Sequence, residues 1–532
     1  MKTYLLFAPA FLEWPLEIAR EMARRCEGAQ TGGLATGHRQ VAQRVASARD
    51  VEISPFAYID DLEREWLATP AAPGEITRYE NFFGTHKLRQ LVISDRQVGR
   101  GYASGGTLAE TELMQLTRDP EYIERYVAGI LRYFLATLGT FRPDVVFCYA
   151  VAGSQAFALS MVCEHLGIPF GRFNHTRIGK HLIIDDSPLD YLGPVRRRFD
   201  EAQRQPGLLA HRMPAAREYI ASFREKASSP DYLAVHNRRI AKEQSLAHLA
   251  KSALAGMKSA AKLRLGRMEL PLRKPAPARH VSHLVRTALE ARRIKRQKLF
   301  PDPGARPGGP FAFYPLHVDP EAATMVLAHM HTDQLAVIEA LSKSLPLGMR
   351  LVVKEHLPML GQRPAGYYER LERLPGVFLA APEDSGTALV KEAALTVTIT
   401  GTAGWEALLL RKPALLISEP PYAMVGEGFV QCADLSSLPK AVATALALPP
   451  ASDERLALYV AAALDVSFPS GTDIIWNRVT EETVRQNPEF LDAVTSRLIA
   501  MAERGREAAA GQDGPARTAP SPMIAGSHSH HG

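Results

Sequence analysis

A glycine turn in the second half of the chain has the residues to hold a phosphate. The stretch TVTITGTAGWEALLLRKPALLISE, residues 396–419, predicts a buried strand, a turn, a helix and a second buried strand. Glycines let the backbone approach a ligand closely, and a helix amino terminus offers N–H groups with partial positive charge. The turn and first helical turn contain Gly401, Thr402, Ala403, Gly404 and Glu406. Thr402 can add a hydroxyl donor, and Glu406 can accept hydrogen bonds from sugar hydroxyls.

The same pattern has a purely structural explanation, which the sequence leaves open. Gly401 and Gly404 also suit a tight strand-to-helix turn, and Glu406 could offset the helix dipole. The turn lacks the Gly-Lys-Ser/Thr ending of a P-loop.

A second cluster follows the apolar run at 351–353 and consists of Lys354, Glu355 and His356. Lys354 and His356 are two residues apart, so they share one side of the strand if the backbone stays extended. A cation and an imidazole there could stabilise or protonate a leaving phosphate. The alternative is a solvated strand end with Lys354 paired to a carboxylate.

A third cluster directly follows a predicted strand and has the sequence YPLHVDPE, residues 314–321. We expect this loop to contact substrate through His317 and Glu321. His317, His329 and His331 do not have a metal-ligand spacing, and we expect no metal site.

In the first half, Asp185 and Asp186 follow the segment 174–180 and a predicted strand near Phe170. One of these carboxylates could face the phosphate site across a cleft and deprotonate an acceptor hydroxyl. A charged surface hairpin is the competing interpretation.

Alternating strands and helices must position these residues. Residues 1–204 and 311–450 each predict a parallel sheet with helices on its faces, that is, two Rossmann-like α/β domains facing a cleft. A Pro/Gly-rich linker at 301–310 precedes the second domain, helices are expected at 451–505, and a disordered tail at 506–532.

Between the two domains, residues 205–300 predict a basic helical arm. Residues 251–300 hold 14 Lys and Arg residues against two Glu, although the net charge of the whole chain is only +6. The arm could dock on an anionic membrane surface or glycan, bind nucleic acid, or remain solvated. Few aromatic residues are present for base stacking, which makes nucleic acid the unlikely partner.

The remaining composition predicts a cytoplasmic protein. There is no apolar run of about 18 residues, and residues 1–10 suit a first core strand better than a signal peptide. The four cysteines form no C-x-x-C pair and are expected to be buried.

Four motifs occur in an order that resembles the bacterial capsule polysaccharide biosynthesis family. They are FYPLHVDPEAAT, Asp333-Gln334, LPLGMRLVVKEHLP and TITGTAGWEALLLRKPALLI, within residues 310–420. That family includes transferases of the acidic sugar Kdo and shares a two-domain GT-B architecture. The resemblance implies that His356 and the 401–404 turn grip a nucleotide phosphate, and that Gln334 and Glu355 contact substrate. Leu357 stands where the family usually has proline.

The resemblance implies a glycosyltransferase of capsular or other surface polysaccharide synthesis. A nucleotide-sugar, favoured to be CMP-Kdo-like, is the expected donor, a glycan or glycolipid the acceptor, and no cofactor or metal is expected. Lys354 and His356 would stabilise the leaving nucleotide, and Asp185 or Asp186 would serve as base. The basic arm would hold the enzyme at the inner face of the cytoplasmic membrane. A nucleotide-sugar epimerase or hydrolase and a non-catalytic glycan-binding assembly protein remain open as alternatives.

Overall fold

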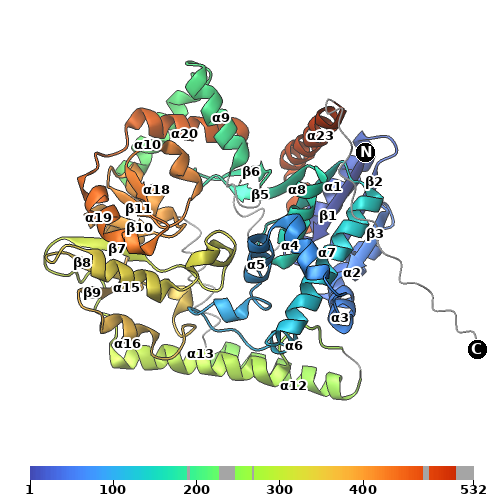
Figure 1. Cartoon of the computed structure of the whole chain (residues 1–532), viewed down its shortest axis with the longest axis horizontal. Coiled ribbons are helices and arrows are strands. Elements are labelled where there is room, and N and C mark those ends of the chain that lie inside the picture. The colour runs from blue at the N-terminus through green and yellow to red at the C-terminus, as the bar shows by residue number, and fades with distance from the viewer. Residues whose placement is uncertain (188–191, 227–245, 267–268, 471–478, 511–532) are drawn as a thin grey trace, which may run out of the picture.

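The computed structural model describes residues 1–187, 192–226, 246–266, 269–470 and 479–510. Two sheets organise the chain (Figure 1), with strand orders β13-β6-β5-β4-β1-β2-β3 and β12-β11-β10-β7-β8-β9. The first sheet contains β1 (Lys2–Phe7), β2 (Gln30–Ala35), β3 (Ile53–Tyr58), β4 (Val145–Cys148), β5 (Phe170–His175), β6 (His181–Asp185) and β13 (Phe468–Pro469). The second contains β7 (Phe311–Pro315), β8 (Arg350–Lys354), β9 (Val377–Ala380), β10 (Leu395–Thr398), β11 (Ala414–Leu416) and β12 (Phe429–Gln431).

Both sheets have the Rossmann strand order. In each, the chain builds outward in one direction, through β1-β2-β3 or β7-β8-β9, and then returns to the centre and builds outward in the other. All pairings of the second sheet are parallel, while β6 pairs antiparallel with both β5 and β13. The predicted fold class, two Rossmann-like α/β domains, is therefore confirmed.

Helices cover both sheets and pack their apolar side chains against them. The first domain has α1 (Glu13–Arg25), α2 (Arg39–Ala46), α3 (Ile59–Ala68), α4 (Glu75–Phe83), α5 (Thr85–Ser94), α6 (Glu112–Leu116), α7 (Pro120–Phe141) and α8 (Ser154–Leu166). The second has α14 (Ala322–Met325), α15 (Gln334–Ser344), α16 (Tyr367–Glu372), α17 (Gly386–Glu392), α18 (Thr402–Leu409), α19 (Leu438–Ala447) and α20 (Asp453–Val466). All four cysteines were predicted to be buried; Cys148, Cys163 and Cys432 are, whereas Cys26 is only partly buried.

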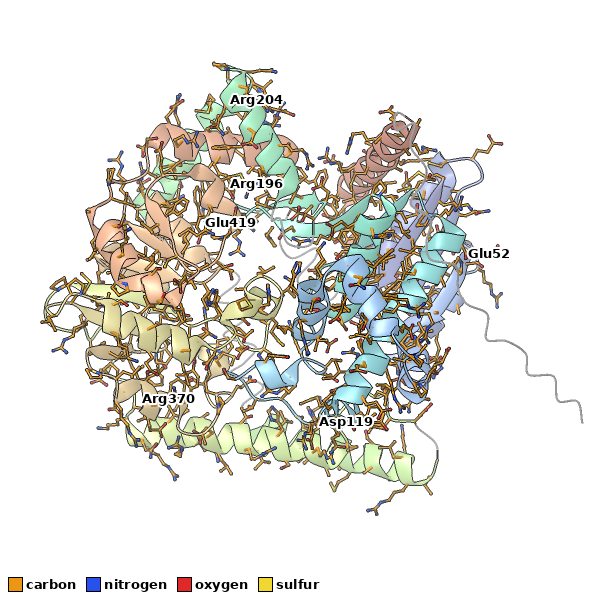
Figure 2. The ribbon with its side chains drawn as sticks, in the orientation of Figure 1. Glu52, Asp119, Arg196, Arg204, Arg370 and Glu419 are labelled. Atoms are coloured by element: carbon orange, nitrogen blue, oxygen red, sulfur yellow. The ribbon has the colours of Figure 1, made fainter. Side chains whose placement is uncertain are left out.

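The predicted boundary at 204/205 is wrong, because two helices around it belong to the second domain. α9 (Gly193–Arg204) and α10 (Met213–Lys226) pack on α20. Val195 and Ile220 share a core with Trp405 of the second domain. Figure 2 shows Arg196 of α9 near Glu419, to which it donates a hydrogen bond of 3.0 Å. The basic arm is thus shorter than predicted.

The predicted C-terminal helical segment divides between the domains. α20 stays with the second domain, whereas α22 (Glu481–Arg485) and α23 (Pro488–Ala510) return to the first, where Phe490 and Leu498 enter its core. Because α23 continues to Ala510, the predicted tail does not begin at 506. The remainder of that prediction, residues 511–532, lies outside the described residues.

The arm itself is a helical hairpin that is attached to both domains. α12 (Leu246–Arg264) packs against α13 (Pro277–Gln297), and the pair runs below both domains in Figure 1. Leu272, in the connection, is buried in the first core, and Ile294 of α13 in the second. In the parts of the chain that the structure describes, no helix is long and apolar enough to cross a membrane.

Candidate functional site

The candidate site lies where the strand order of the second sheet reverses. β7 and β10 are neighbours at this point, and the chains leaving them diverge to opposite sides. Such switch points, at the carboxyl ends of parallel strands, are where α/β proteins form ligand sites. Here β7 leads to His317, and β10 leads through Thr400 to Gly401. Two of the predicted clusters are therefore brought together.

His317 joins these two loops. Its side chain is buried, and its Nε2 accepts a hydrogen bond of 3.3 Å from the Thr400 backbone N–H. Burial, together with the nearby charges of His356, Arg363 and Arg177, lowers the pKa of His317 to about 3. The ring is therefore neutral at pH 7 and carries its proton on Nδ1. This Nδ1 has no hydrogen-bond partner among the described residues.

Gln334 and Arg363 hold the backbone of His317. Gln334 is fully buried; its Oε1 accepts from the His317 N–H at 2.7 Å and its Nε2 donates to the His317 carbonyl at 3.1 Å. Arg363 donates to the same carbonyl at 2.8 Å. Gln334 thus positions His317, and its own amide is used in doing so.

The first turn of α18 presents open backbone donors beside His317. Gly401 is the N-cap residue, and no side chain caps the helix. The first N–H groups of a helix have no carbonyl partner within it, so this turn suits an anion. A Cβ on Gly401 would lie 2.7 Å from Thr398 Oγ1 and 3.3 Å from His317 Nε2. Glycine is therefore required for the close packing of the two loops.

Gly404, Thr402 and Glu406 of this helix make contacts inside the second domain. A Cβ on Gly404 would lie 2.2 Å from the Tyr422 hydroxyl, which donates to the Gly401 carbonyl at 2.7 Å. Burial raises the pKa of Glu406, and hydrogen bonds from Thr387 and Thr402 oppose that rise. The Thr387 hydroxyl donates to Glu406 Oε2 at 2.7 Å. The structure therefore directs the Thr402 hydroxyl and the Glu406 carboxylate toward each other, inside the domain.

The Lys354-Glu355-His356 cluster spans the end of a strand. β8 ends at Lys354, and His356, whose backbone is extended, is the N-cap of a 3-10 turn, η3 (Leu357–Met359). The shared face of Lys354 and His356 stays a prediction. Burial lowers the pKa of Lys354, and the carboxylates of Glu355, Asp384 and Glu383 oppose this shift. His356 instead lies close enough to His317 to affect its pKa.

Glu355 is a structural residue in this geometry. Its buried carboxylate accepts two hydrogen bonds from Arg363, at 2.6 and 2.9 Å, and one from the Tyr368 hydroxyl at 2.9 Å. The His356 N–H donates to it at 2.7 Å. Glu321, also predicted to contact substrate, is the N-cap residue of the short helix α14.

Arg177 reaches this site from the first domain and was not singled out by the sequence. It follows β5, and its charge acts on the pKa of both His317 and Tyr422. Burial dominates both shifts, but a charge can act on these two groups only from close by. Its guanidinium donates no hydrogen bond to a described residue. The signal was present in the segment 174–180, a cationic loop at a strand end.

Asp185 and Asp186 are not brought to the switch point, which corrects the predicted catalytic base. Because β6 runs antiparallel to β5, Asp185 pairs with Arg172, away from the carboxyl end of β5. Its buried carboxylate accepts hydrogen bonds from Arg172, Asn174 and the N–H groups of Leu192 and Gly193.

Asp186 pairs with Arg197 and lines an open cavity of about 700 Å³ at the amino end of β5. That cavity lies between α8, α9 and α23, and it contains none of the residues gathered at the switch point.

Loops from the two domains are joined by hydrogen bonds near the site. The Gly105 N–H donates to Asp319 Oδ2 at 2.6 Å, Arg363 donates to the Gly105 carbonyl at 2.8 Å, and the Thr107 N–H donates to the Gln362 carbonyl at 2.8 Å. A Cβ on Gly106 would lie 1.7 Å from the Asp319 carbonyl oxygen. The relative position of Arg177 and His317 is therefore supported by direct contacts between the domains.

Among the residues that the structure describes, no three His, Cys, Asp or Glu side chains gather as a metal site would need. The chain matches no protein-family model and no curated protein.

Several solved structures are similar over most of the chain. A beta Kdo 2,7 transferase KpsC from Thermosulfurimonas dismutans is 12% identical, with 93% of this chain and 99% of that chain covered and a TM-score of 0.31. UDP-GlcNAc 2-epimerase from Neisseria meningitidis is 11% identical, with 88% and 98% covered and a TM-score of 0.22. The glycosyltransferase VinC is 12% identical, with 95% and 100% covered and a TM-score of 0.26. At these scores the comparisons carry no argument about activity.

Proposed function

We propose that this protein is a glycosyltransferase that uses a nucleotide-activated sugar in the synthesis of capsular or another surface polysaccharide. The observation that carries the proposal is the arrangement at the second switch point. An uncapped helix terminus and a neutral histidine with an unused N–H lie there, and the charge of an arginine from the other domain acts on the pKa of that histidine. These groups are complementary to a phosphate held between two Rossmann-like domains.

In this proposal each group has a separate task. The first N–H groups of α18 and the guanidinium of Arg177 bind the nucleotide phosphate. His317 donates its Nδ1–H to a phosphate or sugar oxygen, because its low pKa keeps it neutral. As the glycosidic bond breaks, negative charge grows on the leaving nucleotide, and fixed donors of this kind stabilise it without reorganising.

The motif resemblance favours a CMP-Kdo-like donor and a glycan or glycolipid acceptor. With Asp185 and Asp186 placed elsewhere, we propose His175 as the base toward the acceptor. It ends β5, two residues before Arg177. Burial lowers its pKa to about 4, so the ring is unprotonated at pH 7 and acts as a weak general base.

Ligand binding tests the phosphate site directly. The thermal stability of the full chain should rise with one class among CMP, UDP and GDP, or their sugars, because a ligand that binds only the folded state stabilises it by about 2.7 kcal/mol at a hundredfold excess over Kd. Calorimetric titration then gives the affinity. No stabilisation at any nucleotide concentration up to several millimolar would contradict the proposal.

A pair of variants locates the binding. Arg177→Ala should weaken nucleotide affinity roughly tenfold or more, since a hydrogen bond to a charged group contributes about 1.5–3 kcal/mol. Lys180→Ala removes an exposed cation from the same loop and should leave affinity unchanged. Equal effects of the two substitutions would show that only general charge matters.

Turnover separates the reaction classes. A transferase releases nucleotide in step with an acceptor, so adding acidic glycan fragments should raise the rate. An epimerase or hydrolase consumes the sugar nucleotide without any acceptor. A glycan-binding protein does neither, and Arg177→Ala would then leave its glycan binding intact.

A further inference from the structure

The hairpin α12–α13 exposes apolar side chains to an unusual degree. Eight large hydrophobic residues are exposed in the described part of the chain, and five of them lie on this hairpin. Those five are Leu254 (51% exposed), Met257 (63%), Leu265 (64%), Val285 (42%) and Leu289 (56%). Their concentration in one element distinguishes them from scattered surface residues, which need no explanation.

On α12 the exposed apolar residues form one stripe. Leu254, Met257 and Ala261, with Leu265 directly after the helix, recur every three or four residues, so they share a face, and all four are exposed. The opposite side packs on α13, where a Cβ on Gly256 would lie 3.0 Å from Val281. The stripe is therefore the outer face of the hairpin.

Cations run beside this stripe. Lys251, Lys258 and Lys262 are exposed and lie on the adjoining edge of α12 by their spacing. None of the three forms an ion pair with a described residue. These charges are available to an external partner.

The exposed face of α13 has the same character. Val285, Leu289, Arg292 and Arg296 follow one another at intervals of four, three and four, which makes a single exposed stripe. Arg292 and Arg296 have no ion-pair partner among the described residues, unlike Arg293, which pairs with Glu369.

We infer that the exposed stripes of α12 and α13, which together form the outer face of the hairpin, bind the surface of an anionic lipid bilayer. Lysine and arginine attract the lipid phosphates, and the aliphatic side chains enter the boundary between headgroups and acyl chains. Nucleic acid explains the cations but gives no role to exposed leucine, methionine and valine side chains. The inference is independent of the chemistry at the switch point.

The attachment of the hairpin gives this contact a consequence. Arg273, in the connection, forms ion pairs with Glu63 and Asp95 in the first domain. Gly361 of the second domain packs against α13, where a Cβ would lie 2.3 Å from the Thr287 carbonyl oxygen. A bilayer bound by the hairpin would therefore fix the orientation of both domains relative to the membrane.

Vesicle co-sedimentation of the full chain tests the inference. The protein should sediment with vesicles containing about one third phosphatidylglycerol, much less with pure phosphatidylcholine, and less in 0.5 M NaCl because salt screens the charges. Equal binding to both kinds of vesicle, or none to either, overturns it. Binding to a mixed-sequence DNA or RNA oligonucleotide without binding to vesicles overturns it in favour of nucleic acid.

Two pairs of variants separate the apolar and cationic contributions. Leu254→Ser/Leu289→Ser should reduce the partition coefficient about tenfold or more, whereas Leu347→Ser, at an exposed leucine outside the hairpin, should not. Lys258→Gln/Lys262→Gln should reduce it about 25-fold, at about fivefold for each near-surface cation, and Lys440→Gln should have no effect. All sites are exposed, so unchanged melting temperatures are expected. Binding unaffected by both double variants would overturn the assignment to this face.

Discussion

Two clusters of buried polar groups, one in each domain, are used in opposite ways. In the first domain, Glu63, Asp95 and Arg273 form a closed network: Arg273 donates to Asp95 at 2.9 and 3.1 Å and to Glu63 at 2.8 Å. Ser154 and backbone N–H groups complete the coordination of Asp95. At the second switch point, by contrast, His317 Nδ1 and the first turn of α18 keep donors without a partner in the described chain.

This difference shows which property points to a candidate ligand site. Buried charge alone does not, since the first-domain network contains more of it and has no free donor or acceptor to offer. Unused hydrogen-bonding capacity at a strand terminus does, because a buried polar group without a partner has a cost that a ligand can remove. The same reasoning places Asp185 and Glu355 with the structural residues.

Removing Arg273 should have the largest effect on stability. Burial raises the pKa of Glu63, whereas for Asp95 the hydrogen bonds and charge of Arg273 overcome burial and hold the pKa well below its usual range. Arg273→Leu leaves both carboxylates buried without their cation, and we expect a loss of about 3–5 kcal/mol in the free energy of unfolding. Urea denaturation at pH 7 measures it.

Arg279→Leu is the matched control, because Arg279 is exposed and contacts Glu110 at 3.5 Å. Its expected cost is about 0–1 kcal/mol. If the two variants had similar stability, the first-domain network would not be the structural element that this comparison assumes.

Gly404, in the first turn of α18, should be a structural position. Gly404→Ala places a methyl group against the Tyr422 hydroxyl, and we expect a loss of about 1–2 kcal/mol, since overpacking costs about 1–3 kcal/mol and alanine favours the helix by up to about 1 kcal/mol. Gly404→Ala/Tyr422→Phe should recover part of this loss in urea denaturation. No recovery would mean that the hydroxyl is not the obstacle.

The fold could be predicted from the sequence wherever the local alternation of strands and helices determines it. Buried strands such as 311–315 and 350–354, with a helix after each, are enough to predict Rossmann-like domains. The positions of α9, α10 and α23 depend instead on which distant core accepts their apolar faces. Val195 shares a core with Trp405 of the second domain, and Leu498 lies in the core of the first. The spacing of nearby residues predicts neither position.

The site was only partly predictable for a similar reason. The sequence identified the loops of His317 and Gly401, because both follow strong strand patterns. It did not reveal that β6 is antiparallel, which takes Asp185 away from the switch point. It also did not reveal that Arg363 pairs with the Glu355 carboxylate. Arg177 was missed because the role that we propose for it depends on the two domains lying side by side.

The smallest expected effect concerns the protonation of His317. Its pKa of about 3 in the folded chain compares with 6.5 for an unperturbed histidine. The unfolded chain therefore binds a proton that the folded chain does not, so stability is present above pH 6.5 and is lost as the pH falls toward 3. Between pH 7 and pH 5.5 this contribution falls by about 1 kcal/mol.

His317→Gln lacks the titrating group, while His175 and the carboxylates are unchanged. The free energy of unfolding should therefore fall by about 1 kcal/mol less in this variant than in the wild type when urea denaturation is repeated at pH 7 and pH 5.5. An identical pH dependence would mean that the folded chain accepts a proton on His317. The ring would then need an acceptor for a second N–H, and the contrast between a closed first-domain network and an open second-domain site would have to be redrawn.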